Sequence, residues 1–172
     1  QNMGQPEKAR QVLQVDMYQH LLFLVDEGTL LLAFYQEEPL RAERIIARTE
    51  QVLETFALET LHPLVALNFY LASALYYARR AERERSLAQL ERYGAVCAQG
   101  DLLYTLHGDD YFDLITPWLE ELTLGPAVPR DPRLVRESLY ESVAQNPLLA
   151  FLKEETRFEQ LLQKLRFHLL KA

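Results

Sequence analysis

The chain has 172 residues, enough for one domain or one compact repeat array but not for two domains with large cores. Its 18 Lys and Arg residues against 25 Asp and Glu residues give a net charge of −7, which disfavours a broad nucleic-acid-binding surface. Hydrophobic residues make up 49% of the chain and aromatic residues 10%, so it can bury a core and is not intrinsically disordered.

Cysteine usage and hydropathy indicate the cellular compartment. Cys97 is the single cysteine, which excludes an internal disulfide framework and a Cys-rich zinc site. The N-terminus lacks the basic region and apolar run of a signal peptide. The most apolar stretch, residues 21–35, contains two adjacent acids and is shorter than a membrane span. We therefore expect a soluble, cytoplasmic protein that does not contact membranes.

Helical periodicity dominates the first half of the chain, and no stretch alternates as a strand does. It predicts a helix over about 6–26, a break or kink at Gly28 and a resumed helix to residue 37. Pro39 suits the first turn of the next helix, which should end near residue 57. The helix expected over 62–80 is apolar on more than one face, so we place it at the centre of the fold.

Further helices are expected over 83–99, 111–122, 132–145 and 147–170, the last one broken near residue 155. Asp110 would cap the helix over 111–122, and Pro117 would kink it. Residues 124–132 form the one long, Pro-rich connector. Seven to nine helices with short connections predict an all-α fold, either an antiparallel helical bundle or a short stack of α-hairpins. We interpret residues 1–172 as a single domain and residues 1–4 as a tag remnant.

The segment 67–93 resembles a single degenerate tetratricopeptide repeat, the helix pair that stacks into solenoids. The matching residues are Tyr70, Ala74 and Tyr77 in the first helix and Ser86 and Leu90 in the second. Small residues there let two helices approach, and the aromatic residues fill the space beside them. Tyr93, Ala98 and Ser73 depart from the pattern.

Together with the segment 156–165, this hairpin resembles the C-terminal helical part of bacterial helix-turn-helix transcription regulators. The resemblance implies a non-enzymatic ligand-sensing and dimerisation domain, which would reach DNA only through a domain absent from this chain. It also implies a concave ligand-binding face for a peptide or a small apolar molecule, formed by Asn68, Leu71, Leu75 and Arg79. The alternative for Asn68 is a hydrogen bond to a neighbouring loop or a buried carbonyl.

The C-terminal segment favours self-association. It carries more apolar side chains than one neighbouring helix can cover: Phe158, Leu161, Leu162, Leu165, Phe167 and Leu169. We therefore expect a homodimer with two-fold symmetry, the most common arrangement of soluble oligomers.

Two other functions remain open at this point, a protein–protein interaction adaptor and a divalent-metal enzyme. The enzyme would use Asp109, Asp110 and Asp113, the DDxxD string with which isoprenyl synthases hold magnesium-bound diphosphate. A second metal-binding motif is missing, and the string follows Gly108, where aspartates cap a helix. We expect capping, and no catalytic residue, metal or cofactor.

Three smaller patterns receive structural interpretations. Glu59 and His62 have the Glu-x-x-His spacing of di-iron bundles, but such sites need two copies. Asp16 and His20 should form a surface pair across one helical turn. The arginines over 79–92 alternate with glutamates, which predicts a salt-bridged, solvated turn.

Overall fold

The computed structural model describes residues 4–122 and 131–171. The described residues form eight α-helices and two short 3₁₀ helices, with no strand among them, which confirms the all-α prediction. The α-helices are α1 (Gly4–Phe34), α2 (Pro39–Thr55), α3 (Leu58–Leu61), α4 (Pro63–Arg79), α5 (Arg83–Cys97), α6 (Ile115–Glu121), α7 (Pro132–Ala144) and α8 (Thr156–Leu170). The 3₁₀ helices are η1 (Gly100–Tyr104) and η2 (Pro147–Leu152). Residues 124–130 of the expected connector lie outside the described residues.

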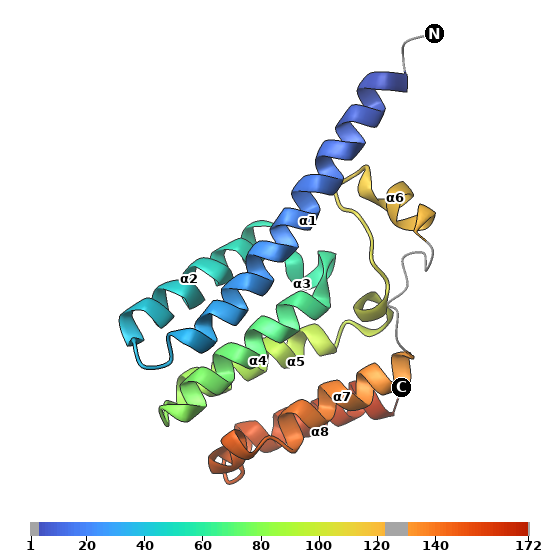
Figure 1. Ribbon diagram of the computed structural model, residues 1–172. Helices are drawn as coiled ribbons and strands as arrows, with labels where there is room; N and C mark the ends of the chain where they lie inside the picture. The colour runs from blue at the N-terminus through green and yellow to red at the C-terminus, as the bar shows by residue number, and fades with distance from the viewer. Residues whose placement is uncertain (1–3, 123–130, 172) are drawn as a thin grey trace.

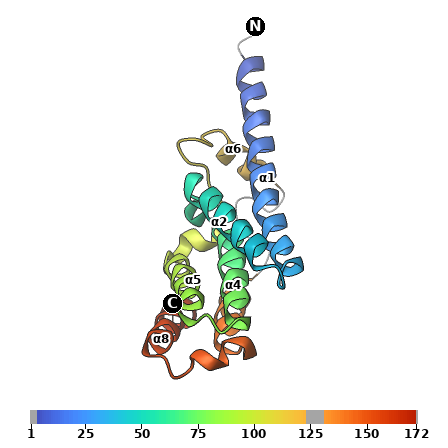
Figure 2. The same cartoon turned by 90° about the vertical axis from the view of Figure 1, so that its left-hand side faces the viewer.

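Three antiparallel hairpins, α1–α2, α4–α5 and α7–α8, make up the body of the molecule (Figure 1). The middle hairpin lies between the other two, because α4 packs against α1 and η2 while α5 packs against α8. The hairpins stack in two layers: α1 packs against α4 in one, and α5 in the other packs against α8 and forms ion pairs with α2. Figure 2 shows the stack from its side, with α1 and α2 above α4 and α5, and α8 below them. The fold is thus an α-hairpin stack, one of the two architectures expected from the sequence.

The helix over 63–79 is central, as predicted. Eleven of the 17 residues of α4 are buried, and its aromatic residues Phe69, Tyr70, Tyr76 and Tyr77 are at most 3% exposed. The two small residues singled out in the hairpin are in contact, because Ser86 Oγ donates a hydrogen bond to the Ala74 carbonyl oxygen at 3.0 Å.

Gly28 does not break the first helix, so the predicted break is wrong. α1 continues through it from Gly4 to Phe34. A Cβ atom at Gly28 would lie 3.0 Å from Thr49 Oγ1 of α2. The absence of a side chain therefore allows α2 to approach α1 closely, and the helix tolerates the glycine at a cost of about 1 kcal/mol relative to alanine.

The segment before α6 also differs from the prediction. Asp109, and not Asp110, provides the cap, since its Oδ1 accepts hydrogen bonds from the backbone N–H groups of Tyr111 and Phe112 at 2.9 and 2.8 Å. The α-helix begins only at Ile115. Pro117 then falls in the first turn, where its missing N–H is tolerated and no kink is required.

The C-terminal segment packs into its own stack. Phe158, Leu161, Leu165 and Leu169 of α8 are at most 4% exposed, and Leu162 is half-buried. Of the six residues expected to drive dimerisation, Phe167 alone is largely exposed. The argument that this segment needs a second copy to cover it is therefore wrong, because α5 and α7 cover it. The homodimer itself stays a prediction.

Ion pairs connect neighbouring hairpins in the layer that contains α2, α5 and α8. Arg85 pairs with Glu43 of α2, and Arg157 of α8 pairs with Glu84 and Glu91 of α5. The arginine-rich hairpin is therefore not only a solvated turn as expected, since its members pair with other hairpins as well as with each other. Among the described residues, no helix combines the length and apolar character that a membrane span requires.

Candidate functional site

The four residues of the predicted ligand face share one strip of α4. Asn68 and Arg79 are exposed, and Leu71 and Leu75 between them are half-buried. The other sides of α4 are covered by α1, α3, α5 and η2, so this strip is the open part of the helix. The side chains of Asn68 and Arg79 make no hydrogen bond or ion pair within the described part of the chain. Neither the loop nor the carbonyl considered for Asn68 uses its amide.

The strip is too long for a small ligand to reach both polar ends. Asn68 and Arg79 are eleven residues apart, which corresponds to about 16 Å along a helix. Arg79 lines a hollow of about 310 Å³ together with Gln36, Glu37 and Arg80. The two polar residues therefore do not share a pocket, and a ligand that touches both must be extended.

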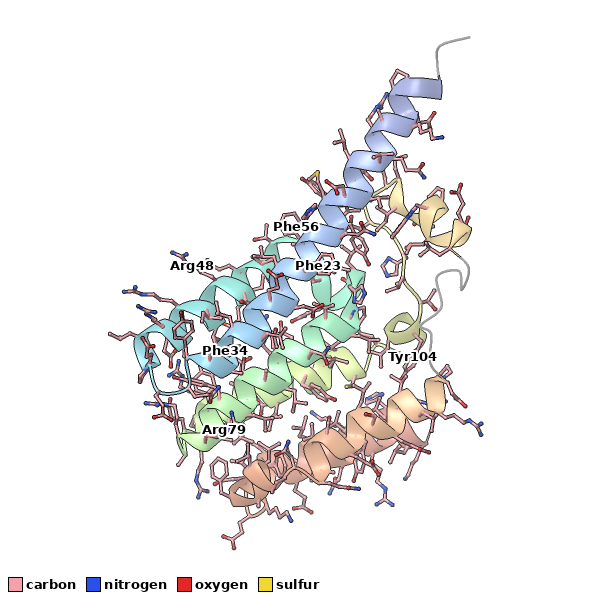
Figure 3. The ribbon with its side chains drawn as sticks, in the orientation of Figure 1. Phe23, Phe34, Arg48, Phe56, Arg79 and Tyr104 are labelled. Carbon is pink, nitrogen blue, oxygen red and sulfur yellow. The ribbon has the colours of Figure 1, made fainter. Side chains whose placement is uncertain are left out.

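An exposed apolar row on α1 accompanies this strip. Phe23, Leu30 and Phe34 share one side of α1 and are 62%, 65% and 83% exposed. Figure 3 shows Phe23 and Phe34 along α1 and Arg79 at the end of α4. The surface of the first layer thus combines apolar side chains from α1 with the polar ends of the α4 strip.

A second candidate site, which the sequence did not predict, is a groove between α1 and α2. This outer groove has a volume of about 780 Å³ and is lined mainly by apolar side chains, among them Leu24, Leu31, Ile45, Val52 and Phe56. Its floor is the close approach of Gly28 to Thr49. The available signal was that α1 is apolar around its whole circumference at 21–25 and 30–32, more than a helix at the end of a stack needs.

The acidic string over 109–113 has no metal-binding geometry in this fold. Residues 109–113 form a turn and not a helix, so carboxylates at i and i+4 do not share a helix face. Asp109 caps this turn through its Oδ1, and Asp113 Oδ1 accepts a hydrogen bond from Gln14 Nε2 at 2.7 Å. Asp109 thus orders the turn itself, and Asp113 holds the segment to α1.

Glu59 and His62 point to different partners. Glu59 accepts hydrogen bonds from Tyr70 and Arg92, whereas the His62 ring lies 6.3 Å from the Tyr18 ring, measured between centroids. Burial lowers the pKa of His62 below its ordinary value. No group of three or more His, Cys, Asp or Glu side chains within the described ranges could hold a metal ion. Asp16 and His20 form the expected surface pair, at 3.5 Å.

The titratable groups of the core are held in their neutral forms. Burial raises the pKa of the Cys97 thiol to about 12, so the thiol is not a nucleophile at neutral pH. Burial and the neighbouring glutamates also raise the pKa of the Tyr70 and Tyr77 hydroxyls, which therefore act as hydrogen-bond donors.

Comparison with protein-family models, curated proteins and solved structures found no match for this chain.

Proposed function

We propose that this chain is a non-enzymatic ligand-sensing and dimerisation domain of a bacterial transcription regulator that works in the cytoplasm. One observation carries the sensing role: the exposed strip of α4 has an amide at one end and a guanidinium at the other, and neither group has a partner among the described residues. Ligand contacts along this strip would shift the packing between hairpins, because α4 contacts both neighbouring hairpins.

The spacing of the strip favours an extended peptide over a small apolar molecule. An extended chain advances about 3.3 Å per residue, so about five residues span the distance from Asn68 to Arg79. The Asn68 amide can donate to and accept from a peptide backbone. Arg79 can bind a carboxylate through two parallel hydrogen bonds. Apolar side chains of the peptide would lie against Leu71, Leu75 and the exposed row of α1.

Selection from a displayed random heptapeptide library tests this function. We expect enrichment of apolar peptides that carry a carboxylate near one end. Asn68→Ala and Arg79→Ala should each weaken a selected peptide by about tenfold, because each removes hydrogen bonds to the peptide that are worth about 1.4 kcal/mol. Arg44→Ala, which removes an exposed arginine from α2, is the matched control and should leave the affinity unchanged. The sensing role is wrong if no peptide is enriched. It is also wrong if the selected peptides bind the double variant Asn68→Ala/Arg79→Ala as tightly as they bind the parent chain.

A further inference from the structure

The first hairpin ends the stack, and no other described helix covers its outward surface. Its inward surface packs against the middle hairpin, since α1 contacts α4 and Glu43 of α2 pairs with Arg85 of α5. The outward surface carries the outer groove, along which Leu24 and Leu31 are 57% and 44% exposed. End units of stacked-helix proteins normally present a polar outer surface. This apolar end is therefore suited to receive another pair of helices.

Two opposite charges flank the outer groove at the same height. Glu27 lies on the α1 rim and Arg48 on the α2 rim, and both are exposed. Their chain neighbours Gly28 and Thr49 are in contact, which sets the two charges level with each other across the groove. Neither side chain forms an ion pair with any other described residue. Each rim thus presents one uncompensated charge beside an apolar floor.

This arrangement is complementary to itself. A two-fold axis parallel to the groove places α1 of one molecule opposite α2 of another, because the rotation exchanges the two sides of the groove. Since Glu27 and Arg48 are level, the same rotation brings Glu27 to Arg48 of the second copy, and Arg48 to Glu27 of the second copy. Leu24 and Leu31 then enter the opposite groove. A two-fold interface uses the same surface on both partners, as this surface allows.

We propose that a second copy of this chain docks on the outer groove, so that two α1–α2 hairpins form a four-helix unit with reciprocal Glu27–Arg48 pairs. This inference rests on the dimerisation role proposed above and gives it a surface. The outer groove thus takes the place of the C-terminal segment as the expected site of self-association, because α5 and α7 of the same chain already cover that segment.

Reciprocal charge exchange, measured by sedimentation velocity on the full chain, tests the pairing. Glu27→Arg and Arg48→Glu each place like charges opposite each other at both ends of the symmetric interface. Each should raise the dimer dissociation constant by at least about tenfold. The double variant Glu27→Arg/Arg48→Glu restores opposite charges and should return the constant near that of the parent chain. Because both single variants change exposed residues, folding is unaffected, which circular dichroism checks.

A matched pair of apolar substitutions tests the surface. Leu24 and Phe23 are neighbours with similar exposure, 57% and 62%, but only Leu24 lines the outer groove. Leu24→Asp should abolish the dimer, and Phe23→Asp should leave it intact.

The proposal is overturned if the parent chain stays monomeric up to about 100 µM, a concentration at which even a weak specific dimer forms. It is also overturned if the double charge exchange fails to restore association, or if Phe23→Asp disrupts the dimer as strongly as Leu24→Asp. In each of these cases peptide selection on the α4 strip still reports separately on sensing, because none of its four residues lines the outer groove.

Discussion

Tyr77 and Asn68 lie nine residues apart on α4 and have opposite surroundings. Tyr77 is 3% exposed, and its hydroxyl contacts Glu43 and Arg85 of the neighbouring helices. Asn68 is exposed and makes no hydrogen bond among the described residues. Tyr77→Ala should therefore lower the free energy of unfolding by about 3–5 kcal/mol, as expected for truncating a large buried aromatic residue. Asn68→Ala should lower it by less than about 1 kcal/mol, because water already solvates the amide.

Urea denaturation of both variants measures this difference. Leu71→Ala changes a half-buried residue of the strip and should lower the free energy of unfolding by an intermediate amount. If Asn68→Ala destabilises the chain as much as Tyr77→Ala, the amide is part of the core, and the sensing strip loses its best residue.

His62 makes the stability of the fold depend on pH. It is largely buried, its Nδ1 has no hydrogen-bond partner in the described structure, and burial lowers its pKa. The unfolded chain, with an ordinary histidine pKa of about 6.5, therefore binds a proton more readily than the folded chain. Stability should fall as the pH decreases from 7 through 6.5 toward the lower, folded pKa. Asp26 acts in the opposite sense in the carboxyl range, because burial raises its pKa.

The measurement is the free energy of unfolding between pH 7.5 and about pH 5, where the histidine contribution changes. His62→Gln should flatten this part of the profile. His20→Gln makes the same substitution at a histidine whose side chain is 73% exposed and serves as the control for the exchange itself. Equal slopes in the parent chain and His62→Gln would show that another group titrates.

At the scale of the elements, the sequence predicted most helices but not what their exceptional residues do. Pro39 begins α2 as expected, and α4 is central because its apolar residues surround it. Gly28 was misinterpreted because its role depends on Thr49, twenty-one residues away on another helix. The helix over 111–122 was expected to begin at Tyr111 with Asp110 as its cap, because the sequence does not show that Asp109 caps a turn and that the helix begins only at Ile115. The local sequence pattern predicts where helices form, whereas the roles of residues such as Gly28 and Asp109 depend on contacts that the pattern does not show.

Two equivalent clusters, seven residues apart on each helix, connect the first and middle hairpins. Each contains a glutamate of α2, a tyrosine of α4 and an arginine of α5, and the members are Glu43, Tyr77 and Arg85 in one cluster and Glu50, Tyr70 and Arg92 in the other. The guanidinium carbon lies 4.1 Å from the ring centroid in the first and 4.7 Å in the second. A spacing of seven residues keeps all members on one face of each helix. The sequence shows these spacings but not the register that joins them.

Arg92 should be the more important arginine for stability, because it neutralises three carboxylates, those of Glu50, Glu54 and Glu59. Arg92→Met should lower the free energy of unfolding at pH 7 by about 1–2 kcal/mol, since each partly exposed pair contributes up to about 1 kcal/mol. The variant leaves the carboxylates next to each other without a cation, so the loss should shrink as acid protonates them. Denaturation at neutral pH and in the carboxyl range measures both effects.

Arg133→Met is the matched control for this prediction. Arg133 is 78% exposed and pairs only with Asp131, two residues before it, so its loss should cost less than about 0.5 kcal/mol. An equal cost for both substitutions would mean that the clusters do not connect the hairpins.

At the scale of the whole molecule, the two candidate surfaces differ in how far the sequence could predict them. The open strip of α4 carries Asn68, Leu71, Leu75 and Arg79, the four residues that the repeat resemblance implied for a ligand face. Their role in binding a ligand stays a prediction. The apolar residues at 21–25 and 30–32 surround α1, so they indicate an excess of apolar surface but not its side. The position of α1 at the end of the stack decides which side forms the outer groove, and the sequence does not show this position.

The linear order of the hairpins also predicts how the molecule unfolds. The third hairpin packs against the middle one, with α8 on α5 and η2 on α4, and has no comparably extensive packing with α1 among the described residues. Stacked helix pairs are stabilised mainly by nearest-neighbour contacts, so weakening one end affects that end first. Leu165 of α8 is 1% exposed, and Leu165→Ala should cost about 2–5 kcal/mol, borne by the third hairpin.

Trp118 makes this order measurable. It is the only tryptophan, and it lies on α6 beside Val12 and Val15 of α1, at the opposite end from α8. In Leu165→Ala, helical circular dichroism should begin to fall at a lower urea concentration than the change in Trp118 fluorescence. Leu32→Ala, an equally buried leucine in α1, should instead shift the fluorescence transition itself. Superimposable circular dichroism and fluorescence curves for Leu165→Ala would mean that the three hairpins unfold as one cooperative unit, because loss of the third would then remove the support of the other two.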